Sequence, residues 1–293
     1  MRYQQMIEKN CGVPKGTNLK GYRELDGIKF DLNEPTNQMM KLMSVFLEYY
    51  LRSCTIQPKT MLDVGSGSGG LGYYMKTIFP DLEIVSVDGN PGILSSPLIA
   101  DAQHFVVRTD KEYRIVDEVG ETAQFDLITC FEHIEHIAHE EIQQFINNIE
   151  AHSHQDTLFL GTISGSEFED GEEDIHCNIK TAQEWKSFYD AGSFREGGGM
   201  DWEFVDINKF LYQCKSTLEK NNNIEAELIL RQITDYLSNT RQFFLEHFHK
   251  FWFENIVETK RKYGAEAYNG WVHRFHLGTV VTTYNPFKLV DDT

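Results

Sequence analysis

Residues 61–72, MLDVGSGSGGLG, constrain the fold more than any other segment, because a short apolar run passes directly into a turn with five glycines. Glycine lets the backbone turn tightly or approach a ligand closely. The residues before the turn, TMLDV, are typical of a buried strand, and those after it, GLGYYMKTIF, are typical of a helix. A strand, a glycine-rich turn and a helix in this order predict an α/β fold whose first helix begins beside a ligand.

The alternation of strands and helices continues along the chain. Further strands are predicted at 83–88 (EIVSVD), 104–109 (HFVVRT), 125–130 (FDLITC), 157–163 (TLFLGTI) and 276–284 (HLGTVVTTY). One helix is predicted after the fourth strand, where four apolar residues at 142, 145, 146 and 149 share a face, and another over 181–192. Alternation of this kind predicts a parallel sheet with helices on both faces.

We expect four parts along the chain: an N-terminal segment with a helix (1–54), the α/β core (55–206), a helical insertion (207–275), and a final strand and tail (276–293). The insertion is rich in aromatic residues, as in RQFFLEHFHKFWFEN. We interpret these aromatic residues as part of the packed core. The alternatives are that they line a substrate site, form a cap or form a dimer surface, and the last of these makes a homodimer possible.

Composition and charge exclude several classes of function. The hydrophobic fraction of 41% and the charged fraction of 25% are typical of a globular protein. No apolar run approaches the roughly 20 residues that a membrane-spanning helix needs. A net charge of −18 disfavours binding to extended nucleic acid. Five scattered cysteines fit reduced thiols, which predicts a cytoplasmic protein.

The glycine turn fits two ligand-binding patterns. Gly65, Gly67 and Gly70 match the G-x-G-x-x-G pattern of dinucleotide sites, whereas Asp63 with Gly65, Gly67 and Gly69 matches D-x-G-x-G-x-G. An acid at the end of the second strand, Asp88, can accept hydrogen bonds from ribose hydroxyls in either case. Asp63 favours the second pattern over the dinucleotide pattern, because its charge would repel a pyrophosphate and attract an ammonium group.

With the segment FDLITCFEHIEHI at 125–137, these motifs resemble those of the class I S-adenosylmethionine-dependent methyltransferases. The pattern E-x-x-E-H is similar to that of the small-molecule branch, such as the ubiquinone-type O-methyltransferases. The resemblance covers about residues 55–195. It implies a Rossmann-like methyltransferase fold with a mostly parallel, seven-stranded sheet, and S-adenosylmethionine as cofactor.

The resemblance also implies roles for single residues. Asp63 and the backbone of the turn would hold the methionine part of the cofactor, Asp88 would bind the ribose, and Asp110 would meet the adenine amino group, with Asp101 as the competing acid. Phe131 and Glu132 would face the sulfonium side, where Phe131 departs from the small or polar residue usual in the family. The full set of expected cofactor-binding residues is Asp63, Gly65, Ser66, Gly67, Gly69, Asp88, Gly89, Asn90, Asp110 and Phe131.

The expected reaction is methyl transfer to a small-molecule acceptor, with O-methylation favoured and N-methylation open. An acceptor hydroxyl needs a base, for which His136, His176 and Glu132 are the candidates. Glu135 is interpreted as a carboxylate at a helix start. The repeat of His133, His136 and His139 is not taken as a metal site. An NAD-type oxidoreductase and a non-catalytic subunit remain as alternatives.

Overall fold

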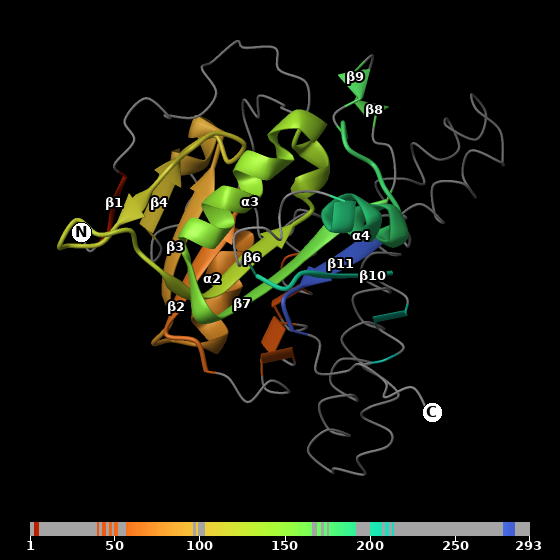
Figure 1. The fold of residues 1–293 in the computed structure, drawn as a ribbon. Coiled ribbons are helices and arrows are strands. Elements are labelled where there is room, and N and C mark those ends of the chain that lie inside the picture. The colour runs from red at the N-terminus through yellow and green to blue at the C-terminus, as the bar shows by residue number, and fades with distance from the viewer. Residues whose placement is uncertain are drawn as a thin grey trace, which may run out of the picture.

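The computed structural model describes residues 57–95, 103–165, 176–191, 200–206 and 278–284, with short pieces or single positions at 3–5, 40–51, 98, 169–174 and 209–213. A central sheet of seven strands organises this part of the chain in the order β10-β11-β7-β6-β2-β3-β4 (Figure 1). Its strands are β2 (Thr60–Val64), β3 (Glu83–Asp88), β4 (Gln103–Val106), β6 (Phe125–Phe131), β7 (Ser153–Ser164), β10 (Glu203–Asp206) and β11 (Gly278–Thr282).

Strands β7, β6, β2, β3 and β4 are parallel to one another, whereas β11 is antiparallel to both β7 and β10. The chain moves outward from β2 to β3 and β4, then returns to place β6 on the other side of β2. Open α/β sheets bind ligands at the carboxyl ends of the strands where the order reverses in this way. The topology therefore places the candidate site at the ends of β2 and β6.

Helices cover both faces of the sheet because successive strand residues point to opposite sides (Figure 1). Leu62 and Val64 of β2 pack in the cluster that includes the helices α3 (Ile142–Ala151) and α4 (Ala182–Ala191). Met61 packs on the opposite face, with α2 (Gly70–Ile78). The predicted mostly parallel, seven-stranded sheet with helices on both faces is thus confirmed.

Short elements complete the described part of the chain. Two small antiparallel pairs join β1 (Gln4–Gln5) to β5 (Ile115–Val116), and β8 (Glu169–Asp170) to β9 (Glu173–Asp174). Three 3-10 turns follow strands or precede α3: η1 (Pro91–Ser95), η3 (Ile134–His136) and η4 (His139–Glu141). No described helix is long and apolar enough to cross a membrane.

The elements differ from the sequence prediction in detail. The strand predicted over 104–109 ends at Val106, and Arg108 and Thr109 belong to the loop that follows. The edge strand β10 was not predicted, because four residues beside a glycine-rich segment carry a weak pattern. Most of the expected insertion at 207–275 lies outside the described residues, although Phe210 near its start is buried in the core.

Candidate active site

The glycine turn after β2 is held by backbone hydrogen bonds to the end of β3. The N–H groups of Gly65 and Ser66 donate to the carbonyl oxygen of Val87, over 2.9 and 3.2 Å. Gly65, Gly67 and Gly69 all have positive φ angles, which side chains with a Cβ rarely adopt. The glycines therefore create a tight turn directly before α2, as the sequence predicted.

Asp88 ties this turn to the next loop. Its Oδ2 accepts a hydrogen bond of 2.9 Å from the Gly67 N–H, and its Oδ1 accepts one of 2.8 Å from the Asn90 N–H. Burial raises the pKa of Asp88, and the two hydrogen bonds offset part of that rise. Each carboxylate oxygen can accept a further bond, so the predicted ribose contact remains compatible with the turn.

Asp63 lies at the end of β2 and is only 3% exposed. Its Oδ1 accepts a hydrogen bond from the hydroxyl of Thr129 on β6, whereas Oδ2 is buried without a hydrogen bond among the described residues. Desolvation raises the pKa of Asp63 to about 7, the Thr129 hydrogen bond lowers it, and the charge of Asp88 raises it slightly. A buried carboxylate oxygen with no donor is suited to a cationic ligand group.

Other buried polar atoms around the turn also lack partners in the described part of the chain. They are the Ser66 hydroxyl oxygen and the Asn90 side-chain nitrogen, together with Asp63 Oδ2. Native proteins leave few buried polar atoms unsatisfied, and a bound ligand is one reason for an exception. These atoms, the positive-φ glycines and the two acids fit a cofactor with an ammonium group and a ribose, as S-adenosylmethionine has.

The remaining expected cofactor residues have less distinctive surroundings. Both oxygens of Asp110 bind the Arg108 guanidinium, so that carboxylate already has a cationic partner. The ring of Phe131 belongs to the hydrophobic cluster that also contains α2, which gives it a packing role. Gly89 lies between Asp88 and Asn90, and Asp101 lies outside the described residues. Their contacts with a cofactor stay predictions.

A second group of polar residues follows β6. Glu132 has a φ angle of +50°, and no other non-glycine residue in the described part of the chain has a positive φ. Its N–H donates to the Thr162 carbonyl oxygen over 3.0 Å, and its Oε1 accepts a 2.7 Å hydrogen bond from the Thr162 hydroxyl. A strained backbone held by the neighbouring strand is typical of functional positions.

The interpretation of Glu135 as a carboxylate at a helix start holds only in part. Glu135 lies in the first turn of the short 3-10 helix η3, whereas the α-helix α3 starts at Ile142. The side chain is fully buried. Desolvation raises the pKa of Glu135 well above its usual value, and the charge of Glu132 raises it further. The backbone N–H groups of Glu135 and Ser164 lower that pKa, but neither carboxylate oxygen completes a hydrogen bond among the described residues.

His136 and His176, the two predicted bases, come together although they are 40 residues apart. Their ring centroids are 4.8 Å apart in an edge-on arrangement. The backbone beside His176 is anchored to η3, since the Asn178 N–H donates to the Glu135 carbonyl oxygen over 3.0 Å. The Cys177 thiol also donates a hydrogen bond of 3.3 Å to the His136 carbonyl oxygen. Tertiary structure thus assembles Glu132, Glu135, His136 and His176 into one cluster.

The other members of the histidine repeat have different partners, although the ring centroid of His133 lies 6.4 Å from that of His136. His133 Nε2 lies 2.7 Å from the Thr109 hydroxyl, and its ring packs against Gly65. Burial lowers the pKa of His133 to about 4. His139 contacts the Phe188 ring, with centroids 4.7 Å apart. The three histidines of the repeat therefore do not share a site.

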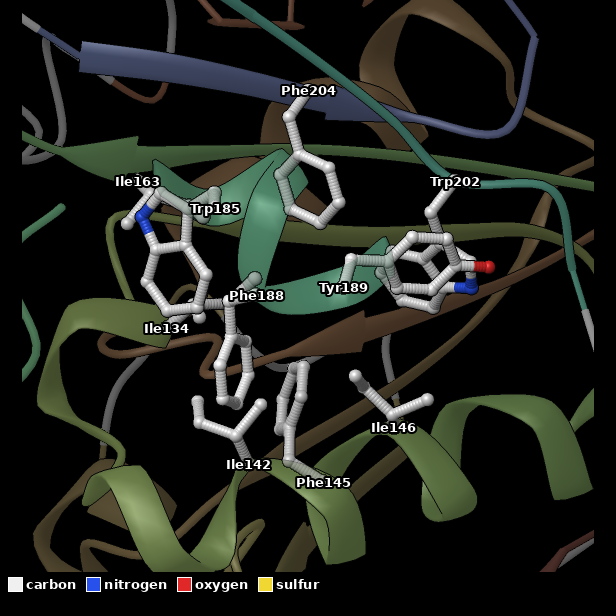
Figure 2. A pocket seen from close by; sticks show the side chains of 10 residues that line it. All are labelled: Ile134, Ile142, Phe145, Ile146, Ile163, Trp185, Phe188, Tyr189, Trp202 and Phe204. Atoms are coloured by element: carbon white, nitrogen blue, oxygen red, sulfur yellow. The ribbon is translucent and has the colours of Figure 1, made fainter. Parts of the chain in front are cut away.

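An apolar pocket lies between α3 and α4, and its lining includes Ile134 of η3. Figure 2 shows aromatic side chains of α4 facing apolar side chains of α3, with Ile134 of η3 beside them. The only hydroxyl in the lining, that of Tyr189, donates to the Met200 carbonyl oxygen over 2.7 Å. This lining belongs to the core cluster on the α3 side, so we assign it to packing that supports η3.

A family model described as a methyltransferase domain matches residues 62–159, which run from β2 into β7. A search of the curated proteins found no significant match.

Among solved structures, the plantazolicin methyltransferase BpumL in complex with a pentazolic desmethylPZN analog and SAH is 14% identical, over 68% of this chain and 80% of that chain, with a TM-score of 0.51. BpumL in complex with SAH is 15% identical, over 69% and 82%, with a TM-score of 0.50. The enzyme BamL, with a triazolic analog and SAH, is 15% identical over 71% and 81%, with a TM-score of 0.49. At these identities the likeness to BpumL supports the fold.

Proposed function

We propose that this chain, in which residues 62–159 match a family model described as a methyltransferase domain, is a class I S-adenosylmethionine-dependent methyltransferase that methylates an oxygen atom of a small-molecule acceptor. The cofactor supplies a methyl group that its positively charged sulfur already activates. The protein therefore has two tasks, which are to align the acceptor with that methyl group and to remove the acceptor's proton.

The cofactor half of the site is formed by the turn between β2 and α2. The buried Asp63 would hold the ammonium group, and Asp88 would bind the ribose while it also fixes the Gly67 and Asn90 backbone. A buried negative charge favours a cationic ligand over a pyrophosphate, which disfavours the NAD-type alternative. The turn and both acids are intact, which disfavours a degenerate, non-catalytic subunit.

One observation supports oxygen as the methylated atom. It is the cluster of Glu132, Glu135, His136 and His176 beyond the end of β6. A neutral amine needs no strong base, whereas a hydroxyl must lose its proton as it is methylated. Carboxylates and imidazoles concentrated at the carboxyl edge of the sheet are the groups that such a proton transfer requires. The cluster therefore favours O-methylation over N-methylation.

The experiment is a screen of hydroxyl and amine compounds with the full-length protein and S-adenosylmethionine labelled in the methyl group. We expect label transfer to a hydroxyl compound. The variants His136→Ala and His176→Ala should then lower kcat by roughly 10²–10⁴-fold, the usual contribution of proton removal, with cofactor affinity nearly unchanged.

The matched control is His139→Ala, which removes a histidine of the same segment that contacts Phe188. It should retain nearly full turnover. Label transfer to amines alone, or full turnover in both of the first two variants between pH 6 and 9, would contradict the proposal.

A further inference from the structure

The geometry points to a binding site for a divalent transition-metal cation formed by Glu135, His136 and His176, which holds the acceptor oxygen beside the methyl donor. The cation site itself is independent of the reaction, and its catalytic role rests on the proposed function. It differs from the histidine repeat considered in the sequence, because only His136 is common to both.

The positions of the ligand atoms carry the first part of the argument. One carboxylate oxygen of Glu135 and one ring nitrogen each of His136 and His176 all lie within 4.8 Å of one another. Two ligands on one ion can be about 4.2 Å apart at most when each bond is 2.0–2.1 Å long. Inward movements of well under 1 Å, within the range of side-chain torsions, would bring all three atoms onto one ion.

The burial of Glu135 is a second and independent observation. The side chain has no exposed surface, and neither oxygen completes a hydrogen bond among the described residues. No ion pair to a lysine or arginine reaches Glu132 or Glu135 in the described part of the chain. Burying a carboxylate that no cation neutralises is costly, and Glu132 adds a second acid close by. A divalent cation would remove this cost.

The backbone holds the three ligands in place without the metal. Glu135 and His136 follow β6 in η3, whereas His176 comes from the segment that bonds to η3 through the Asn178 N–H. Glu132 is held by both the backbone and the hydroxyl of Thr162. Ligands fixed by surrounding structure lose little freedom when an ion binds, which favours binding.

The ligand set selects the class of ion. Two imidazoles and one carboxylate are suited to Mn²⁺, Fe²⁺ or Zn²⁺, whereas Mg²⁺ and Ca²⁺ prefer oxygen ligands alone. Three protein ligands also leave coordination positions open, as catalytic metal sites do. An acceptor with one hydroxyl, or with two neighbouring oxygens, can occupy those positions.

The cation gives the acceptor oxygen its reactivity. Coordination lowers the pKa of a bound hydroxyl. While His136 and His176 hold the ion, the proton passes to solvent or to a nearby carboxylate such as Glu132, and the loss of either histidine lowers kcat because the ion is lost. The oxygen then forms a bond to the methyl carbon as the bond from that carbon to sulfur breaks. The electron pair of the broken bond stays on sulfur, which becomes neutral, and the products are a methyl ether and the demethylated cofactor.

The test is a titration of the full-length, chelator-treated protein with Mn²⁺, followed by the loss of the electron paramagnetic resonance signal of the free ion, with Zn²⁺ as a competitor. We expect one Mn²⁺ per chain. Glu135→Gln and His176→Ala should each weaken binding by at least tenfold, while Glu140→Gln, which changes an exposed acid in η4, should bind as the wild type does.

Glu135→Gln keeps the size of the side chain and removes its charge, and thermal unfolding verifies that the variant folds. His136→Gln is the second variant should Glu135→Gln fail to fold. Wild-type protein that takes up neither Mn²⁺ nor Zn²⁺ would overturn the inference, as would ligand variants that bind Mn²⁺ as tightly as the wild type.

A parallel titration with S-adenosylhomocysteine separates this inference from the proposed function. Glu135→Gln should retain its affinity for that product, because the groups assigned to the cofactor are Asp63, Asp88 and the glycine turn. If the wild type binds Mn²⁺ with the expected variant pattern but not S-adenosylhomocysteine, the cation site stands and the proposed function fails.

Discussion

The Thr129 hydroxyl on β6 donates a 2.9 Å hydrogen bond to Asp63 Oδ1 on the adjacent strand β2, at a point where both side chains are buried. The two residues are paired across the parallel strands. This single donor leaves Oδ2 without a partner and does not overcome desolvation, so that the pKa of Asp63 is raised to about 7. Asp63 is therefore poised between its neutral and charged forms near physiological pH.

Cofactor affinity should depend on pH through Asp63. An ammonium group binds the charged carboxylate, and below a pKa of about 7 the charged fraction falls about tenfold for each pH unit. We expect the affinity for S-adenosylhomocysteine, measured by calorimetry, to rise from pH 5 to about pH 7 and then level off. Asp63→Asn should bind weakly with a flat profile, whereas an unchanged slope in that variant would assign the pH dependence to another group.

Asp63 should also make the ligand-free protein less stable as pH rises. Its folded-state pKa lies above the value of 3.8 for an ordinary aspartate, so its stabilising contribution is full below pH 4 and is lost between about pH 4 and 7. The difference of about three pKa units corresponds to at most about 4 kcal/mol. Asp63→Asn should be the more stable protein at pH 8 in urea unfolding, and equal stability there would argue against the raised pKa.

Asp88→Ala should weaken binding of S-adenosylhomocysteine by about 1–3 kcal/mol, the usual value of a hydrogen bond to a charged group. The loss has two sources, which are the ribose contact and the acceptor for the Gly67 and Asn90 N–H groups. Calorimetry measures the affinity. Asp81→Ala, at an exposed position in the loop before β3, is the matched control and should bind normally. An intact fold with unchanged affinity in Asp88→Ala would contradict the cofactor assignment.

Two glycines of the turn should respond differently to alanine. At Gly65 a Cβ atom would lie 2.3 Å from the His133 ring, whereas at Gly67 it would meet no atom within 4 Å. Both positions have positive φ angles, so each substitution costs about 1 kcal/mol through the backbone. Gly65→Ala should therefore lower the melting temperature more than Gly67→Ala does. Equal melting temperatures would show that His133 moves away without cost.

Gly161→Ala should be strongly destabilising through the sheet itself. A Cβ atom at this position of β7 would lie 2.2 Å from the Cys130 carbonyl oxygen on β6, and backbone cannot move aside as a side chain can. We expect a loss of roughly 3 kcal/mol or more, since severe overpacking in a core reaches this size. Gly72→Ala is the control, because Gly72 also has no positive φ angle and a Cβ atom there would make only ordinary contacts, at 3.6 and 3.8 Å. Similar unfolding midpoints for the two variants would contradict the prediction.

Local patterns in the sequence were sufficient to predict the core of the fold and the cofactor turn. The run TMLDV followed by five glycines in twelve residues specifies a strand and a turn through backbone preferences that need no distant partner. The end of the second predicted strand, Asp88, was placed correctly for the same reason. The short edge strand β10 was missed, because its pairing with β11, more than 70 residues later, provides the stability that its own four residues lack.

The sequence by itself determined which polar groups surround the cofactor turn. They are a glycine turn, an acid before it and an acid at the end of the next strand. Only the tertiary structure decided that His176 lies beside His136, and that the side chain of Glu135 is fully buried. The physical reason is that burial and proximity arise when β6, η3 and residues 176–178 pack together. The charge on Glu135 then depends on Glu132 and on the absence of water, which no local pattern records.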